Sequence, residues 1–177
     1  MQAITNALVR LVVALTALVA VLYLLLLGWG ALVRIPWVNE KTRHLTKPAN
    51  APLRRIAGTR WGAWYFSLSA LKHIGRSSGR AYVTPLSAYP FGDGFVLALA
   101  YPPEKTDWYQ NVLAAGSCTL KYRGQEYALE RPESISISQA ISAYPLLVRP
   151  FIWVNSTNQA VWLHRRPEAS VAVPAEG

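Results

Sequence analysis

The sequence predicts a small, mainly β domain with inserted helices, of the β-barrel kind, preceded by one transmembrane helix. Three observations support this. An apolar run lies near the N-terminus, short β-rich segments alternate with turn signals after it, and only a few segments have helical character. Short strands at close spacing with few helices between them are typical of small barrels. With 177 residues the chain has room for one such domain.

The N-terminal run from Leu11 to Val33 contains no charged residue. As a helix it would be about 35 Å long, and a bilayer core is about 30 Å thick. A cleaved signal peptide has a shorter apolar core and a small-residue cleavage site, which the segment after this run lacks. A buried core helix is seldom apolar on every face. We therefore expect residues 1–33 to be a membrane anchor.

The charges around the anchor predict its orientation. Only Arg10 and the terminal amine precede the run, whereas the basic residues that follow it are Arg34, Lys41, Arg43, Lys47, Arg54 and Arg55. The positive-inside rule then places the domain in the cytoplasm, at the cell membrane. A net charge of +9 calls for an anionic partner. Lipid headgroups and a polyanionic small molecule both fit, whereas no nucleic-acid-binding motif is found.

The first half of the domain follows a basic connector over residues 34–65. This connector contains Pro36, Pro48 and Pro52, and a short helix at 51–57 closed by a glycine is expected in it. Strands are predicted at 66–74 and 81–89, on either side of a polar loop.

The next elements carry sharp local signals. Phe-Gly-Asp-Gly at 91–94 predicts a hairpin turn in which Asp-Gly supplies the positive φ, and a strand follows at 95–101. A helix is predicted over 107–115, with Thr106 as N-cap and Gly116 as C-cap.

The sequence signals for the last elements are weaker. Strands are predicted at 117–122 and 126–131, a helical segment at 138–148, and a final strand at 161–164. The domain is thus expected to occupy residues 66–166, and the Pro-Glu-Ala tail at 167–177 to be disordered.

The loop at 75–80, Gly-Arg-Ser-Ser-Gly-Arg, is the most informative candidate site. Its glycines allow tight turns, its hydroxyls and amides can donate hydrogen bonds, and its arginines can bind a phosphate bidentately. It is not a Walker loop, which ends in Gly-Lys-Ser/Thr. From these residues alone, an anion cradle and a solvated basic turn are equally good interpretations.

No catalytic side chain is predicted. Cys118 lies in a strand pattern and is interpreted as a packed core thiol. His73, next to the loop, is interpreted as structural, with contact to a ligand as the lesser alternative. The three histidines are too scattered for a metal site. Among the many aromatic residues, Trp108 and Tyr144 are candidates for a pocket wall.

Four segments in order resemble the deazaflavin-dependent nitroreductase family. They are the Gly-Arg-Ser-Ser-Gly-Arg loop with the strand before it, Val-Thr-Pro-Leu at 83–86, Gly-Asp-Gly-Phe-Val-Leu-Ala-Leu at 92–99, and Thr-Asp-Trp-Tyr-Gln-Asn from Thr106. The resemblance covers about Leu68 to Glu130. It implies a split β-barrel and an F420-dependent oxidoreductase of the nitroreductase or quinone reductase type. Such enzymes transfer hydride from reduced coenzyme F420 to nitroaromatics and quinones.

The resemblance also implies roles for individual residues. The phosphate and acidic tail of the cofactor would be held by the loop, and the ring would lie along the strand that follows it and beside the helix after Thr106. The implied cofactor-binding residues are Arg76, Ser77, Ser78, Gly79, Arg80, Thr84, Pro85, Ala98, Ala100, Lys105, Trp108 and Asn111. Tyr101 and Tyr144 are the implied substrate-binding residues.

The sequence departs from the family at two places. Ser77 stands where many members have lysine, and Tyr-Pro-Pro-Glu-Lys at 101–105 replaces a Lys-Gly-Gly type of loop. Either Lys105 replaces the missing cation, or the cofactor is held differently. Two alternatives therefore remain: an FMN-binding split barrel, or a non-enzymatic module that binds a lipid or other apolar ligand at the membrane. The acceptor is expected to be apolar and quinone-like, and a homodimer is left open because related barrels often dimerise.

Overall fold

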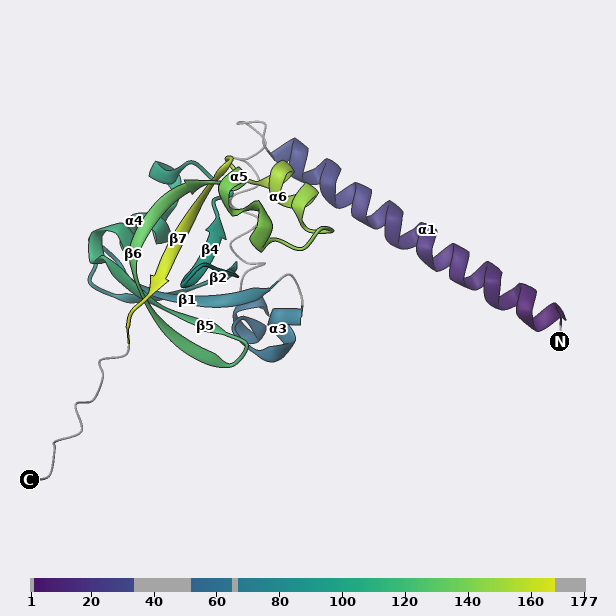
Figure 1. The fold of residues 1–177 in the computed structure, drawn as a ribbon, viewed down its shortest axis with the longest axis horizontal. Helices are drawn as coiled ribbons and strands as arrows, with labels where there is room; N and C mark the ends of the chain where they lie inside the picture. The colour runs from purple at the N-terminus through teal and green to yellow at the C-terminus, as the bar shows by residue number, and fades with distance from the viewer. Residues whose placement is uncertain (1, 34–51, 65–66, 168–177) are drawn as a thin grey trace, which may run out of the picture.

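A long apolar helix stands off from a β-rich domain in the computed structural model (Figure 1), which describes residues 2–33, 52–64 and 67–167. This helix, α1 (Gln2–Val33), exposes its apolar side chains, and its segment Ile4–Leu25 is long and apolar enough to cross a membrane. The predicted helix is confirmed, but the candidate span lies nearer the N-terminus than 11–33. Membrane insertion itself stays a prediction, as does the orientation of the domain.

The domain is built on one sheet of seven antiparallel strands. Their order is β2-β1-β5-β6-β7-β4-β3. The strands are β1 (Leu68–Ile74), β2 (Ala81–Ser87), β3 (Tyr89–Phe91), β4 (Gly94–Ala98), β5 (Ser117–Tyr122), β6 (Gln125–Ser136) and β7 (Gln159–Arg165). The sheet is open because β2 and β3 are its edges and do not pair with each other. The predicted class, mainly β with inserted helices, is confirmed.

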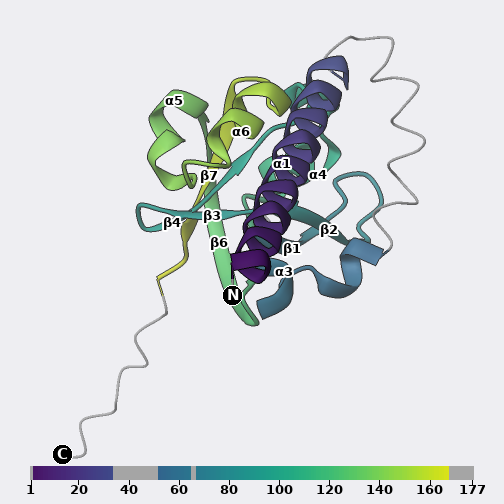
Figure 2. The same cartoon turned by 90° about the vertical axis from the view of Figure 1, so that its right-hand side faces the viewer.

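Short helices cover the ends and one side of this sheet (Figures 1 and 2). They are α3 (Arg60–Trp64), η1 (Pro103–Lys105), α4 (Asp107–Ala115), α5 (Ile137–Ala140), η2 (Ile141–Ala143) and α6 (Arg149–Asn155). Residues 52–56 are helical too, and Gly58 after them has φ +76°, so the predicted short helix is confirmed where it is described. Residues 34–51 and 65 of the predicted connector (34–65) lie outside the described residues, as does the predicted tail beyond residue 167. The domain limits stay predictions.

The 107–115 helix is confirmed at both ends, with one correction. Gly116 ends it in the left-handed conformation at φ 67°. Thr106 occupies the N-cap position, but its hydroxyl makes no capping bond. It donates instead to the carbonyls of Tyr101 and Pro102, at 3.1 and 3.0 Å. Thr106 therefore fixes the chain before the helix rather than the helix amides.

The turn at 91–94 was predicted with the wrong glycine. Phe91 pairs with Gly94, so Gly92 and Asp93 form the two-residue turn, and the positive φ of 54° is at Gly92. Gly94 lies in β4, where a Cβ would stand 1.9 Å from the carbonyl oxygen of Leu163. Both positions need glycine, one for backbone conformation and the other for close approach of β7.

The region after β6 also differs from its prediction. A helix was expected at 138–148, whereas the chain forms only α5 and η2, breaks at 144–148, and begins α6 at Arg149. Pro145 disfavours helical conformation at the residue before it, and Tyr144 is extended with φ −90° and ψ 132°. As a result, α6 turns away from the helix that was predicted and packs against α1.

Two of the buried clusters in the core bear on the position of the site. The larger includes Leu71, Phe95, Leu120 and Leu163, and a smaller one forms around Tyr144 and Val96 where α5, η2 and α6 cover the sheet. Because Tyr144 belongs to the smaller cluster and also lines a cleft, the packing of α6 determines one side of the candidate site.

Candidate functional site

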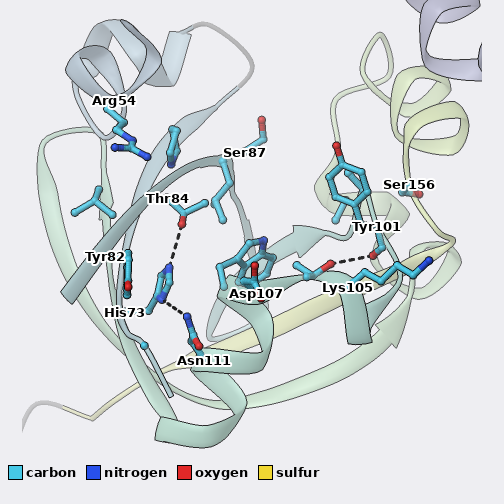
Figure 3. A pocket seen from close by; sticks show the side chains of 18 of the residues that line it. Arg54, His73, Tyr82, Thr84, Ser87, Tyr101, Lys105, Asp107, Asn111 and Ser156 are labelled. Carbon is cyan, nitrogen blue, oxygen red and sulfur yellow. Dashed lines mark hydrogen bonds between the residues drawn. The ribbon is translucent and has the colours of Figure 1, made fainter. Parts of the chain in front are cut away.

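A cleft of about 940 Å³ lies between the β1–β2 side of the sheet, the 75–80 loop and α4 on one hand, and Tyr144 with α6 on the other. Figure 3 shows it from close by. Many sequence-predicted site residues line it together: Arg76, Ser77, Ser78, Thr84, Pro85, Ala98, Ala100, Tyr101, Lys105, Trp108, Asn111 and Tyr144. Gly79 and Arg80 are not among the lining residues. The structure thus brings most of the predicted set to one place, while their roles toward a ligand stay predictions.

A chain of hydrogen bonds links β1, β2 and α4 along one side of the cleft (Figure 3). His73 Nε2 lies 3.0 Å from Thr84 Oγ1, and His73 Nδ1 lies 3.2 Å from Asn111 Nδ2. Asn111 Oδ1 in turn accepts from the backbone amide and from Nη1 of Arg76, at 3.1 and 3.0 Å. We call these four residues the polar wall: His73, Arg76, Thr84 and Asn111.

The donors and acceptors of the polar wall determine one another. Since Asn111 Oδ1 accepts from Arg76, its amide nitrogen faces His73 and donates to Nδ1. His73 then carries its proton on Nε2 and donates to the Thr84 hydroxyl. The Thr84 proton is left free to be donated to another group, so the network presents an oriented hydroxyl at the lining of the cleft.

The charge state of His73 agrees with this arrangement. Burial lowers the pKa of His73 from its ordinary value of 6.5, opposed by the nearby carboxylate of Asp107, which raises it. A protonated ring would also lose the bond from Asn111, because Nδ1 could no longer accept. Neutral His73, stacked on Tyr82 at 5.9 Å between ring centroids, is therefore the form that the site favours at neutral pH.

The 75–80 loop is held by its own bonds and by α4. The Gly75 amide donates to the Arg80 carbonyl at 2.8 Å, and Ser78 Oγ lies 3.1 Å from the Tyr82 hydroxyl. A Cβ at Gly75 would lie 2.6 Å from Ser78 Oγ, so glycine allows the loop to close. The amides of Ser77 and Ser78 have no hydrogen-bond partner within the described residues. The loop thus offers two amides and two hydroxyls on a fixed backbone.

The cleft is lined by more positive than negative charge. Arg54, Arg76 and Lys105 line it, against one acidic residue, Asp107. Arg76 Nη2 is 3.5 Å from the Asp107 carboxylate in a partly exposed pair that contributes little stability. Arg54 and Lys105 lie on opposite sides of the view in Figure 3. Arg54, which was not expected to line the cleft, is therefore one of its cations, whereas Arg80, which was expected to, is not.

Apolar and aromatic side chains make up the other side. We call Tyr89, Tyr144, Phe151 and Ile152 the apolar wall, and all four line the cleft. The rings of Tyr89 and Tyr144 meet edge to face at 4.9 Å. Burial raises the pKa of Tyr89 to about 12 and raises that of Tyr144 further. Both hydroxyls consequently keep their protons at physiological pH.

The Tyr144 hydroxyl is buried and has no hydrogen-bond partner among the described residues. A buried polar group without a partner typically costs about 1–3 kcal/mol. Since Tyr144 lines the cleft, a ligand with an acceptor atom is one way to satisfy it. This orphan donor is a structural signal for a bound group.

Sequence reasoning missed three contributors to the cleft. Arg54 was assigned to the connector and His73 was interpreted mainly as structural. No site residue was expected on α6, which supplies Phe151 and Ile152 and is followed by Ser156, a third lining residue. His73 could have been found from the sequence, because it lies two residues before the start of the loop at Gly75. Arg54 and α6 had no such local signal, since the tertiary packing alone brings them to the cleft.

Cys118 is placed as expected. It is buried in β5, and burial raises the pKa of its thiol to about 12, so it remains a protonated core residue. In the described residues no group of His, Cys, Asp and Glu is arranged to hold a metal ion.

Comparison with solved structures gives distant likenesses. No family model and no curated protein matches the chain. An F420-H2-dependent reductase (FDR-A) is 14% identical with a TM-score of 0.38, covering 55% of this chain and 94% of that one. An F420 reductase is 12% identical with a TM-score of 0.42, covering 59% and 88%. A haem-binding protein from Mycobacterium smegmatis is 14% identical with a TM-score of 0.40, covering 60% and 49%.

The structures similar to this one therefore include the F420-dependent reductases that the sequence resembles.

Proposed function

We propose that this protein is a membrane-anchored split-barrel oxidoreductase that binds reduced coenzyme F420 and reduces a quinone or nitroaromatic-type acceptor. The observation that carries the proposal is the division of one cleft into a polar wall with adjoining cations and an apolar wall with an orphan hydroxyl. One side suits an anionic cofactor, and the other suits a flat apolar molecule.

The residues present fit the cofactor. Its phosphate and acidic tail need cations and amide donors, which Arg76, Arg54 and the Ser77–Ser78 amides supply. Lys105 adds a cation on the opposite side. The flat ring of the cofactor needs an apolar slot, and Pro85 and Trp108 line one side of the cleft. When bound, reduced coenzyme F420 supplies the hydride, and the protein binds, orients and excludes water.

The residues of the chain have separable tasks in this proposal. Thr84, held by His73, offers its hydroxyl proton to an acceptor atom of a bound ring. Tyr144 keeps its proton and offers a second donor, toward the group being reduced. Asn111 positions Arg76 and His73 at once. None of these tasks needs a charged nucleophile, and none was predicted.

The apolar helix α1 adds the membrane part of the proposal. Anchored through α1, with the domain on the cytoplasmic side, the cleft would be near lipid-soluble acceptors and a soluble reduced cofactor. A quinone is for this reason the preferred acceptor. A homodimer remains compatible with the proposal.

A titration tests the cofactor directly. The full chain, purified in detergent, is titrated with coenzyme F420 while the cofactor's fluorescence is followed, and FMN is titrated in parallel. We expect saturable binding of F420 at micromolar protein and a faster oxidation of its reduced form when a quinone is added. If FMN alone gives saturable binding, the cofactor is FMN and not F420. If neither cofactor gives a saturable signal and lipid copurifies with the protein, the non-enzymatic lipid-binding module is favoured.

A further inference from the structure

The chain between Tyr144 and the end of α6 exposes large apolar side chains. Leu146 is 74% exposed, Leu147 is 82% exposed and Trp153 is 44% exposed. Single exposed leucines are ordinary, but adjacent ones beside a cleft form a local apolar surface of the kind that contacts apolar partners. We call Leu146, Leu147 and Trp153 the ridge.

The ridge lies against α1. The Tyr23 hydroxyl of α1 donates to the Leu147 carbonyl at 2.8 Å, and α6 packs along α1. Figures 1 and 2 both show α6 beside the part of α1 nearest the domain. The rest of α1 extends away from the domain with its apolar side chains exposed. The ridge is therefore continuous with the surface of the candidate membrane helix.

The contact at Tyr23 fixes where the ridge lies along that helix. From Ile4 to Tyr23, α1 rises about 29 Å, which matches a hydrocarbon core of about 30 Å. If this stretch spans the bilayer, the ridge stands where α1 leaves the core. Arg10 lies in the N-terminal third, from which its long side chain can reach toward the nearer headgroups. The remainder of α1, beyond Tyr23, then runs alongside the domain.

The helix α3 provides a second indication that this part of the domain lies at the membrane surface. Trp61 and Trp64 of α3 are 81% and 91% exposed. Trp64 lines a shallow groove together with Pro145, Val148 and Arg123, so α3 adjoins the ridge segment. In Figure 1, α3 and α6 both lie on the side of the sheet from which α1 extends. Exposed tryptophans beside arginine are typical of residues at a membrane–water interface.

We propose that the ridge is a bilayer-docking surface, which inserts into the boundary between headgroups and acyl chains next to α1. Other residues of α6, Phe151 and Ile152, line the cleft, so docking would hold the apolar wall at the membrane surface. The inference rests on the proposed membrane anchoring of α1, and it does not depend on the proposed cofactor or reaction.

The test uses the full chain in vesicles of phosphatidylcholine and phosphatidylglycerol. A fluorophore that senses its environment is attached to Leu147→Cys, which leaves the backbone carbonyl that Tyr23 binds unchanged. The matched control is Ala115→Cys, an exposed position in α4. In Figure 1, α4 lies on the side of the domain away from α1. Native Cys118 is buried with a raised pKa and should remain unlabelled. Leu146→Cys is a second site on the ridge.

Two quenchers read the outcome: a lipid with a nitroxide near its headgroup, and iodide in the water. We expect the lipid nitroxide to quench the Leu147 probe several-fold more than the Ala115 probe, with iodide showing the reverse. Equal quenching of both probes, with the protein still floating with the vesicles, would overturn the ridge but not the anchor. Protection from iodide without quenching by lipid would indicate a second protein chain on the ridge and would also overturn the proposal. Failure to float would overturn the anchor and the ridge together.

Discussion

The two walls of the cleft differ in how far their polar groups find hydrogen-bond partners within the protein. The polar wall joins β1, β2, the loop and α4 through hydrogen bonds in which each side chain fixes the next. The apolar wall is made by packing around Tyr144, and it leaves one buried hydroxyl without a partner. The comparison suggests that the polar wall is preorganised for one charged group, whereas the apolar wall needs a bound ligand to provide the missing hydrogen-bond partner.

The largest effect should come from a cation of the polar wall. Arg76→Ala should weaken F420 binding by roughly 10- to 100-fold, because a hydrogen bond to a charged group contributes about 1.5–3 kcal/mol. Arg80→Ala is the matched control: it removes an equal charge from the same loop at a position that does not line the cleft. The affinities of both variants are measured by fluorescence titration.

Equal losses for the two arginines would contradict the geometry of the loop. They would mean that net charge near the cleft, rather than a contact from Arg76, holds the cofactor. The salt dependence of both variants would separate a contact from a long-range field.

An intermediate effect is expected from the apolar wall. Tyr144→Phe keeps the ring against Tyr89 and removes the unpartnered hydroxyl. The ligand-free protein should be more stable by about 1 kcal/mol, because no buried donor is left unpaired. The same change should weaken binding of an acceptor that uses this hydroxyl. Thermal unfolding with and without acceptor measures both effects, and a loss of ligand-free stability would mean that the hydroxyl has a partner after all.

The smallest effect concerns pH. The pKa of His73 is lowered on folding, so below its ordinary value of 6.5 the unfolded chain binds more protons than the folded one. Wild-type stability should thus decrease as pH falls below 6.5, and His73→Gln should lack this component. Denaturant unfolding in detergent from pH 8 to pH 5 gives the difference between the two proteins. That difference should shrink as pH falls, and a constant difference would contradict a neutral His73.

The accuracy of sequence interpretation varied with how local the signal was. The helix at 107–115 was placed correctly because Gly116, which ends it in the left-handed conformation, is a signal that acts only on the adjoining residues. The prediction of one helix over 138–148 was wrong because Pro145 disfavours helical conformation at Tyr144, which is extended and packs against the sheet. In the hairpin, either glycine could supply a positive φ by local chemistry, and the pairing with β7 decided which one does.

The candidate site shows the same division. Arg76, Thr84, Trp108 and Asn111 came from one stretch of the chain, where a resemblance could be read in order, and the structure brings them to one cleft. Arg54 and Ile152 were missed because they are far from that stretch in sequence and reach the cleft through packing. No local pattern marks a residue whose only connection to a site is the position of its helix.

What the sequence determined by itself was an apolar helix at the N-terminus, a mainly β domain, and a basic glycine-rich loop between two strands. Hydropathy, alternation and turn chemistry act over a few residues, so these features follow from neighbours along the chain. Only the tertiary structure decided that Arg54 rather than Arg80 lines the cleft, that Tyr144 is buried without a partner, and that α6 lies between the cleft and α1. These features depend on contacts between residues up to 124 positions apart, as in the bond from Tyr23 to Leu147, which no local pattern encodes.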